Sequence, residues 1–403
     1  MPRSDSFDSF DSFDSFDSFD SFDSFSAGGG QGSGRLAEAL TRSREGHLGR
    51  PAQKHVNHEE FKFQPGLLRQ WGAERGSTKL PQPGPQWLVR MDSRFRVQVC
   101  MAELMREAVF DDGNLSNAGR SPLATLRLGR GAPLATLELD TPTREAFERQ
   151  ALRVESWASL RSERAAEVLA QKSVLQPFWS SVVNLKADVM PRTNELLATA
   201  IAFSSNVVQQ VKYRMACPRP WEYSARIQPM IDVPGHHAWP SGHATQAFMV
   251  CELLANLIWR EGMPLQPFRE MHLQLLRQAE RIATNRVIAG LHFPIDNDAG
   301  FVLGTLLARL VVNLGTRAST PVPLKHKCLR DWGDTTGKSD FAFRTELLEL
   351  SAFPKGLPPG GKAKPAPPDR PTRFTPSTPV EWLWDRAGAE WHGPGEPGGG
   401  YGA

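Results

Sequence analysis

The chain has 403 residues, a formal net charge of +3 and 40% hydrophobic residues, which is enough for one large domain or two of medium size. The charge is close to balance and forms no concentrated basic stripe, so no nucleic-acid partner is predicted. The four cysteines are far apart and form no CxxC pair, a pattern typical of reduced thiols rather than of a zinc site or a disulfide scaffold.

The N-terminus contains no cationic segment followed by an apolar core, so no secretory signal is predicted. The most apolar stretches, 247–259 and 299–314, each contain a charge and are shorter than the roughly 20 apolar residues that cross a bilayer. We therefore expect buried core helices, no transmembrane segment and a cytoplasmic location.

The two ends of the chain are biased in composition. Residues 5–25 repeat Asp-Ser-Phe seven times, and a glycine-rich stretch follows, so 1–35 is predicted to be a disordered linker. Residues 36–139 are of uncertain structure, with "RFRVQVCMAELM" open to a strand or a helix and packing on the core left open. Residues 319–403 form a Pro/Gly-rich extension that we expect to be mostly disordered, although Trp382, Trp384 and Trp391 are expected to dock back on the core.

Residues 140–318 are predicted to be a helical core. A Thr cap and a proline in the first turn open a helical pattern near residue 143. Apolar residues then recur at helical spacing in "MPRTNELLATAIAFSSNVVQQVKYRM", in 244–260, in 267–289 and in 297–314. Short connections between amphipathic helices predict an all-α helical bundle with disordered N- and C-terminal extensions.

A Pro240–Ser241–Gly242–His243 turn stands directly before one of these apolar helices. The free N–H groups and the dipole of a helix start bind anions, and Gly242 lets the backbone approach a ligand closely. His243 would then stand at the edge of an anion pocket, where it can donate or accept a proton. An ordinary loop histidine is the alternative.

A second segment places Arg286, His292 and Asp296 around a predicted helix boundary. Gly290 is expected to end one helix in the left-handed conformation, and Pro294 suits the first turn of the next. His292 and Asp296 would then lie one turn apart on the same face, where a carboxylate fixes the imidazole tautomer and raises the nucleophilicity of the other nitrogen. The alternative is a solvent-facing histidine and a helix-capping aspartate.

Lys212 and Arg219 form a third segment, with six residues between them and with Pro218 and Pro220 flanking the arginine. The planar guanidinium of Arg219 suits two phosphate oxygens, and Lys212 supplies a point charge. The alternative for Lys212 is a solvated position on a helix.

Together the three segments resemble the pattern shared by the type 2 phosphatidic acid phosphatases (PAP2) and the vanadium-dependent haloperoxidases: K-x6-RP, then PSGH, then SR-x5-H-x3-D. The resemblance covers roughly residues 140–315, and every position but one matches. Asn285 stands where the pattern has serine, which puts one phosphate contact in doubt.

The resemblance implies a role for each residue of the pattern. His292 would be the nucleophile that forms a phosphohistidine, or the ligand of vanadate in a haloperoxidase, with Asp296 orienting it. His243 would be the general acid and then the base. The oxyanion would be held by Lys212, Arg219, Ser241, Gly242 and Arg286. No divalent metal is implied, because three cations already stabilise the transferred group.

The motifs fit two activities. A soluble phosphomonoesterase with a small phosphorylated substrate and no cofactor is favoured, because the core holds about one bundle of helices. The alternative is a vanadate-dependent haloperoxidase that oxidises halide with peroxide, and His236, seven residues before His243, is a candidate to modulate halide or substrate there. A non-catalytic oxyanion-binding protein is the second alternative, although it would not need the His292–Asp296 pair. Neither the natural substrate nor the oligomeric state follows from the motifs.

Overall fold

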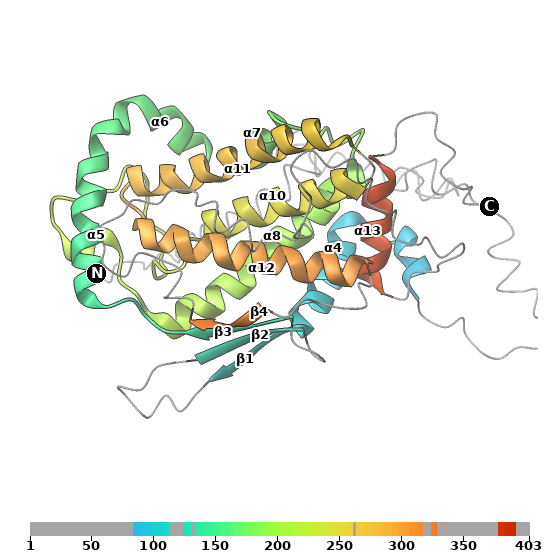
Figure 1. Ribbon diagram of the computed structural model, residues 1–403, viewed down its shortest axis with the longest axis horizontal. Helices are drawn as coiled ribbons and strands as arrows, with labels where there is room; N and C mark the ends of the chain where they lie inside the picture. The colour runs from blue at the N-terminus through green and yellow to red at the C-terminus, as the bar shows by residue number, and fades with distance from the viewer. Residues whose placement is uncertain are drawn as a thin grey trace, which may run out of the picture.

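The computed structural model describes residues 84–112, 124–129, 134–260, 263–316, 324–328 and 378–391. The Asp-Ser-Phe repeat and most of the C-terminal extension, both predicted to be disordered, lie outside these residues. The described part is mostly helical, which confirms the predicted fold class, and its long central helices run lengthwise through the molecule in Figure 1.

Four long helices form the centre of the bundle: α8 (Pro191–Met215), α10 (Gly242–Arg260), α11 (Leu265–Ile288) and α12 (Pro294–Thr316). α10 packs against the other three, and its side chains are buried along almost its whole length. The predicted boundaries are correct to within about a turn, because the prolines and glycines that flank these helices are strong stop and start signals.

Shorter helices close the two ends of the bundle. α5 (Arg144–Trp157), the 3-10 turn η3 (Ala158–Leu160) and α6 (Arg161–Ala170) cover one end (Figure 1). The predicted helix start there is displaced, because Thr143 rather than the threonine before Pro142 accepts the capping bond, from the N–H of Ala146 at 3.2 Å. The remaining short elements are α7 (Gln176–Ser180), α9 (Pro220–Tyr223), the 3-10 turn η2 (Pro85–Arg90) and α4 (Ser93–Arg106).

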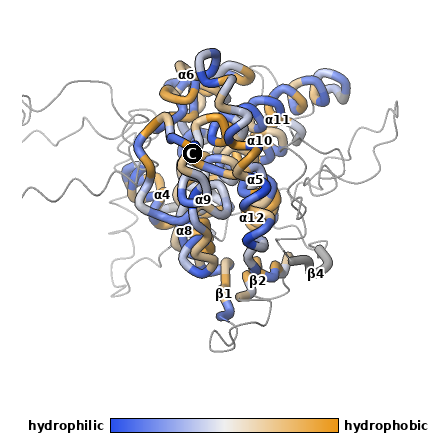
Figure 2. Tube along the Cα trace, turned by 90° about the vertical axis from the view of Figure 1, so that its left-hand side faces the viewer, coloured by the Kyte–Doolittle hydropathy of each residue, from blue (hydrophilic) through white to orange (hydrophobic). Residues whose placement is uncertain are grey.

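A small sheet lies along one side of the bundle, below α8 and α12 in the end-on view of Figure 2. Its strands are β1 (Ala108–Asp112), β2 (Ala124–Leu128), β3 (Ala135–Leu139) and β4 (Leu324–Cys328). β1, β2 and β3 pair antiparallel, and β4 joins β3 in parallel. The all-α prediction did not include this sheet. Its strands are only five residues long, although β2 and β3 bury alternate side chains as half-buried strands do.

The region before residue 140, whose structure the sequence left open, is partly described. "RFRVQVCMAELM" lies wholly in α4, which packs on α8. Cys100 and Leu104 of α4 and Leu126 of β2 belong to the same buried apolar cluster as the long helices. These elements therefore share one core with the bundle.

The C-terminal extension contains a helix, α13 (Pro379–Ala389), which packs on α8, α12 and α4. Trp382 and Trp384 are buried at its inner face. At its end, the carboxylate of Glu390 accepts hydrogen bonds from the N–H groups of Arg192 and Thr193, at 2.6 and 2.7 Å. Glu390 therefore caps the start of α8, which has no side-chain cap of its own.

One of the described helices, α12, is long and apolar enough to cross a membrane by length and composition, with a mean hydropathy of 1.5. In the structure, 78% of this apolar stretch is buried inside the protein. A buried core helix has the same length and composition as a spanning one, so this property alone does not distinguish the two.

Two glycines of α12 let it approach α10 closely. A Cβ on Gly300 would lie 2.7 Å from the carbonyl oxygen of Ser241, and one on Gly304 would overlap the carbonyl oxygen of Thr245. The space is limited by backbone atoms, which cannot rotate away as a side chain can. The absence of a side chain at these two glycines thus allows the start of α10 to pack closely against α12.

Replacing Gly300 with alanine is expected to lower the free energy of unfolding by about 1–3 kcal/mol, because the added methyl overpacks the α10–α12 contact. Thermal or denaturant unfolding of the purified protein measures this. Gly235→Ala is the matched control, since a Cβ there meets no atom within 4 Å. Equal stability of the two variants would contradict the close-contact explanation.

Candidate active site

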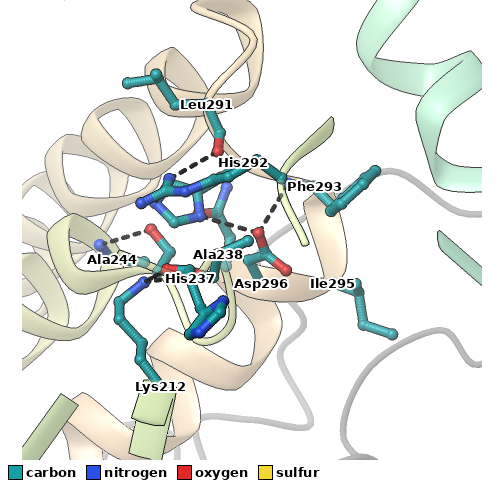
Figure 3. A network of polar contacts seen from close by, with 12 residues as sticks. Lys212, His237, Ala238, Ala244, Leu291, His292, Phe293, Ile295 and Asp296 are labelled. Carbon is teal, nitrogen blue, oxygen red and sulfur yellow. Dashed lines mark hydrogen bonds and ion pairs between the residues drawn. The ribbon is translucent and has the colours of Figure 1, made fainter. Parts of the chain in front are cut away.

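The three sequence segments converge at one end of the long helices. Lys212 lies in the last turn of α8, and Arg219 lies in the loop that follows. Gly242 and His243 open α10, Arg286 lies in the last turn of α11, and His292 with Asp296 lies at the start of α12. Figure 3 shows Lys212 of α8 close to His292 and Asp296 at the start of α12.

The His292–Asp296 pair is formed as predicted. Gly290 has a left-handed φ of +79° after the end of α11, and α12 begins at Pro294. Nδ1 of His292 lies 2.9 Å from Oδ2 of Asp296, and the N–H of Phe293 donates to the same oxygen at 3.0 Å (Figure 3). The carboxylate therefore holds the proton on Nδ1 and leaves Nε2 with a free lone pair.

Nε2 of His292 faces a guanidinium. Nη1 of Arg219 lies 3.2 Å from it and also donates to the carbonyl oxygen of Leu291 at 2.9 Å. Burial and the charges of Arg219 and Lys212 hold the pKa of His292 well below its usual range, so the ring is neutral. A neutral imidazole whose Nε2 lone pair faces fixed cations is suited to attack an anionic phosphoryl group.

Lys212 is buried, with 1% of its surface exposed, and it is held by backbone atoms. Its Nζ donates to the carbonyl oxygens of His237 and Ala238, at 2.7 and 2.6 Å (Figure 3). The proposed alternative of a solvated lysine is therefore wrong. Burial and the neighbouring Arg219 lower its pKa, while the charge of Asp296 raises it.

Arg286 is fully buried and incompletely paired. Its Nη2 donates to the carbonyl oxygen of Val168 and to Oε1 of Gln171, at 3.1 and 3.3 Å. Its Nε and Nη1 are buried and have no hydrogen-bond partner among the described residues. Burial lowers its pKa to about 10, and no carboxylate offsets that effect. A buried cation with two unused donors is a site prepared for an anion.

The turn before α10 differs in part from the prediction. Ser241 is buried, but its N–H donates to the main-chain oxygen of Asp296 at 2.9 Å, so this amide is not free to bind an anion. This bond instead ties the turn to the start of α12. Gly242 opens α10, where a main-chain N–H has no helical acceptor before it, and it is partly exposed.

His243 is fixed by one main-chain contact. Its Nε2 lies 3.0 Å from the carbonyl oxygen of Gln171, which can only accept, so Nε2 carries the proton and Nδ1 is the free nitrogen. Burial, followed by the charge of Arg286, lowers the pKa of His243 to about 3. The ring is therefore neutral at pH 7 in the absence of an anion.

His236 lies beside Arg219. Nη2 of Arg219 is 3.0 Å from Nδ1 of His236, and burial with the charges of Lys212 and Arg219 lowers the pKa of His236 to about 3. The side chain of His237 is exposed, and only its main chain contributes to the site.

Asn285 bridges two side chains that the sequence analysis did not identify. Its Nδ2 donates to Oε2 of Glu167 at 3.0 Å and to Oε1 of Gln171 at 2.9 Å. Glu167 and Gln171 lie at the end of α6, more than a hundred residues before the arginine motif, and no spacing links them to it. Only the folded chain brings them to the site.

The described part of the molecule is thus a helical bundle that holds a histidine–carboxylate pair among three buried cations. Residues 195–319 match the family model of the PAP2 superfamily. The superfamily is of the phosphatase and haloperoxidase type. No curated protein matches the chain.

Proposed function

We propose that the protein is a phosphomonoesterase that acts through a phosphohistidine on a small phosphorylated substrate, without a metal or cofactor. The incomplete pairing of Arg286 is the observation that carries this proposal: its Nε and Nη1 are buried without a partner among the described residues, and its charge acts on His243, as does that of the buried Lys212. A bound phosphoryl group supplies the missing acceptors and the missing negative charge.

In the first step, Nε2 of His292 attacks phosphorus, and the bond from phosphorus to the leaving oxygen breaks. Arg286, Arg219 and Lys212 stabilise the charge on the remaining oxygens. His243 gives the proton on Nδ1 to the leaving oxygen, and Asp296 stabilises the positive charge that develops on His292. This step needs His243 in its charged form.

In the second step, water attacks the phosphohistidine. Nδ1 of His243 takes a proton from the water, the bond from phosphorus to Nε2 breaks, and inorganic phosphate leaves. His243 then carries the proton that the next leaving group receives, so the cycle is balanced.

A dianion bound in the site is expected to raise the pKa of His243 from about 3, because a nearby negative charge favours the protonated ring. Between that value and the raised pKa, binding takes up a proton, so affinity rises as the pH falls.

Calorimetric titration with sulfate at pH 6, in two buffers of different ionisation enthalpy, measures the uptake of protons on binding. Asp296, with its pKa raised to about 7 by burial, also contributes, so the expected result is a smaller uptake in His243→Gln rather than none. Equal uptake in both proteins would contradict the assignment.

Replacing His243 with alanine is expected to lower the hydrolysis rate more for substrates with a more basic leaving group. An alkyl phosphate needs the proton that His243 supplies, whereas p-nitrophenolate leaves without it, so the alkyl substrate should lose about 10²–10⁴-fold and the aryl substrate clearly less. Steady-state rates on both substrates test this. An equal loss on both would show that His243 is not the acid.

The haloperoxidase alternative rests on His236, which contacts Arg219 at the partly exposed edge of the site. His292 would hold vanadate through Nε2, and vanadate would activate peroxide for the oxidation of halide.

A parallel assay separates the two activities: phosphate release is measured without vanadate, and bromide oxidation by peroxide is measured with vanadate. Bromide oxidation without phosphate release would overturn the phosphatase proposal. Binding of phosphate with neither activity would favour an oxyanion-binding protein.

A further inference from the structure

Gln171 contacts both sides of the candidate site. It follows α6, before the segment that matches the family, and it is fully buried. Its main-chain oxygen accepts from Nε2 of His243 at 3.0 Å, and its side-chain Oε1 accepts from Nη2 of Arg286 at 3.3 Å. One residue therefore contacts the proposed acid, His243, and the incompletely paired cation, Arg286.

The orientation of the Gln171 amide follows from its donors. Oε1 accepts from Asn285 as well as from Arg286, and an NH₂ group in that position would face two donors without accepting from either. The oxygen therefore points to α11, and Nε2 occupies the other branch of the amide. Asn285 is in turn held by Glu167, which pairs with Arg281, so the orientation is fixed by a chain of contacts.

Nε2 of Gln171 is buried and has no hydrogen-bond partner among the described residues. The same is true of Nε and Nη1 of Arg286, the residue that Gln171 contacts. An unsatisfied buried donor costs about 1–3 kcal/mol, and here three such donors belong to two side chains in contact with each other. A bound oxoanion can accept from Gln171 Nε2 together with one edge of the Arg286 guanidinium, whose Nε–H and Nη1–H groups point to different edges.

We propose that Gln171 Nε2 is a further hydrogen-bond donor to the bound oxoanion, and that Asn285 is the positioning residue that turns this amide toward it. The proposal rests on the proposed function, because it assumes that a phosphoryl group occupies the site. It adds a neutral donor, from outside the family pattern, to the cations that hold the phosphoryl oxygens.

The experiment measures the affinity of the full chain for inorganic phosphate by calorimetry and the hydrolysis of p-nitrophenyl phosphate. Gln171→Leu removes the donor and is expected to weaken phosphate binding about 10- to 100-fold, as the loss of a hydrogen bond to a charged group does. Gln171→Glu keeps the shape and the contact with Arg286 but replaces the donor with an acceptor, so a loss at least as large is expected. Gln176→Leu is the matched control, because its amide contacts Leu185 and Asn194 at the other end of α8. It should change neither quantity more than about twofold.

The two proposals fail in different ways. If the wild-type protein binds phosphate and both Gln171 variants bind it equally well, the role of Gln171 is overturned and the phosphatase stands. If the wild-type protein neither binds nor hydrolyses, both are overturned. If Gln171→Leu does not fold, the phosphate affinity of Gln171→Glu tests the role of Gln171 instead. Thermal unfolding without phosphate is compared for Gln171→Glu, which keeps the acceptor for Asn285 and Arg286. Weaker phosphate binding at unchanged stability identifies a donor to the anion, whereas a merely structural glutamine would lower the stability of the ligand-free protein.

Discussion

Replacing His292 with alanine is expected to lower the release of phosphate from an aryl phosphate by a factor on the order of 10⁴ or more, because the variant lacks the atom that attacks phosphorus. Colorimetric assay of the purified protein measures this. His237→Ala is the control: the side chain of His237 is exposed, and its contact with Lys212 is made by the main chain, which the substitution keeps. That variant should retain its activity.

A covalent intermediate gives an independent measure of the same role. Acid-labile label from a ³²P-phosphorylated substrate should appear on the wild-type protein after rapid quenching and should be absent from His292→Ala. Activity of His292→Ala at the wild-type level, or label that persists in it, would defeat the assignment of the nucleophile.

Replacing Arg286 with methionine is expected to raise the stability of the ligand-free protein while removing its function. The guanidinium is fully buried, and two of its donors have no partner in the part of the chain that the structure describes, whereas methionine fills much of the same volume without a charge to desolvate. The free energy of unfolding should rise by about 1–3 kcal/mol, and phosphate affinity should fall at least about 100-fold. Chemical unfolding and phosphate titration measure the two effects.

Arg281→Met is the matched control for that experiment. Arg281 lies on the same helix, is partly exposed and pairs with Glu167, so its loss should not stabilise the protein. If Arg286→Met lowers the stability of the protein as much as Arg281→Met does, the interpretation is contradicted. Removing an arginine that stabilises the fold lowers the stability of the protein.

The convergence of the motifs could be predicted because each is tied to a helix end by strong local signals. Gly290 and Pro294 place His292 and Asp296 one turn apart, and the pairing follows from that spacing alone. The use of the Ser241 amide could not be predicted in the same way. Its acceptor is the main-chain oxygen of Asp296, and the approach of α12 that brings this oxygen near depends on packing.

The parts of the fold that the sequence did not predict depend on distant contacts. The strands of the sheet are too short for alternating burial to distinguish them from loops. In addition, β4 pairs with β3 although the whole helical bundle lies between them in the sequence. Gln171 reaches the site because α6 packs on α11, and neither helix specifies that contact in its own pattern. Such residues are found only after the chain is folded.

The bond between Glu390 and the start of α8 has a consequence for how this protein can be shortened. A fragment trimmed to the limits of the family match would begin inside α8 and stop before α13. It would lack Glu390, whose carboxylate accepts from the N–H groups of Arg192 and Thr193. It would also lack Trp384, which packs against Gly315, and Gln171. The smallest piece able to fold with the candidate site intact therefore extends well beyond the recognisable motifs on both sides, and deletion studies should keep α5 through α13 intact.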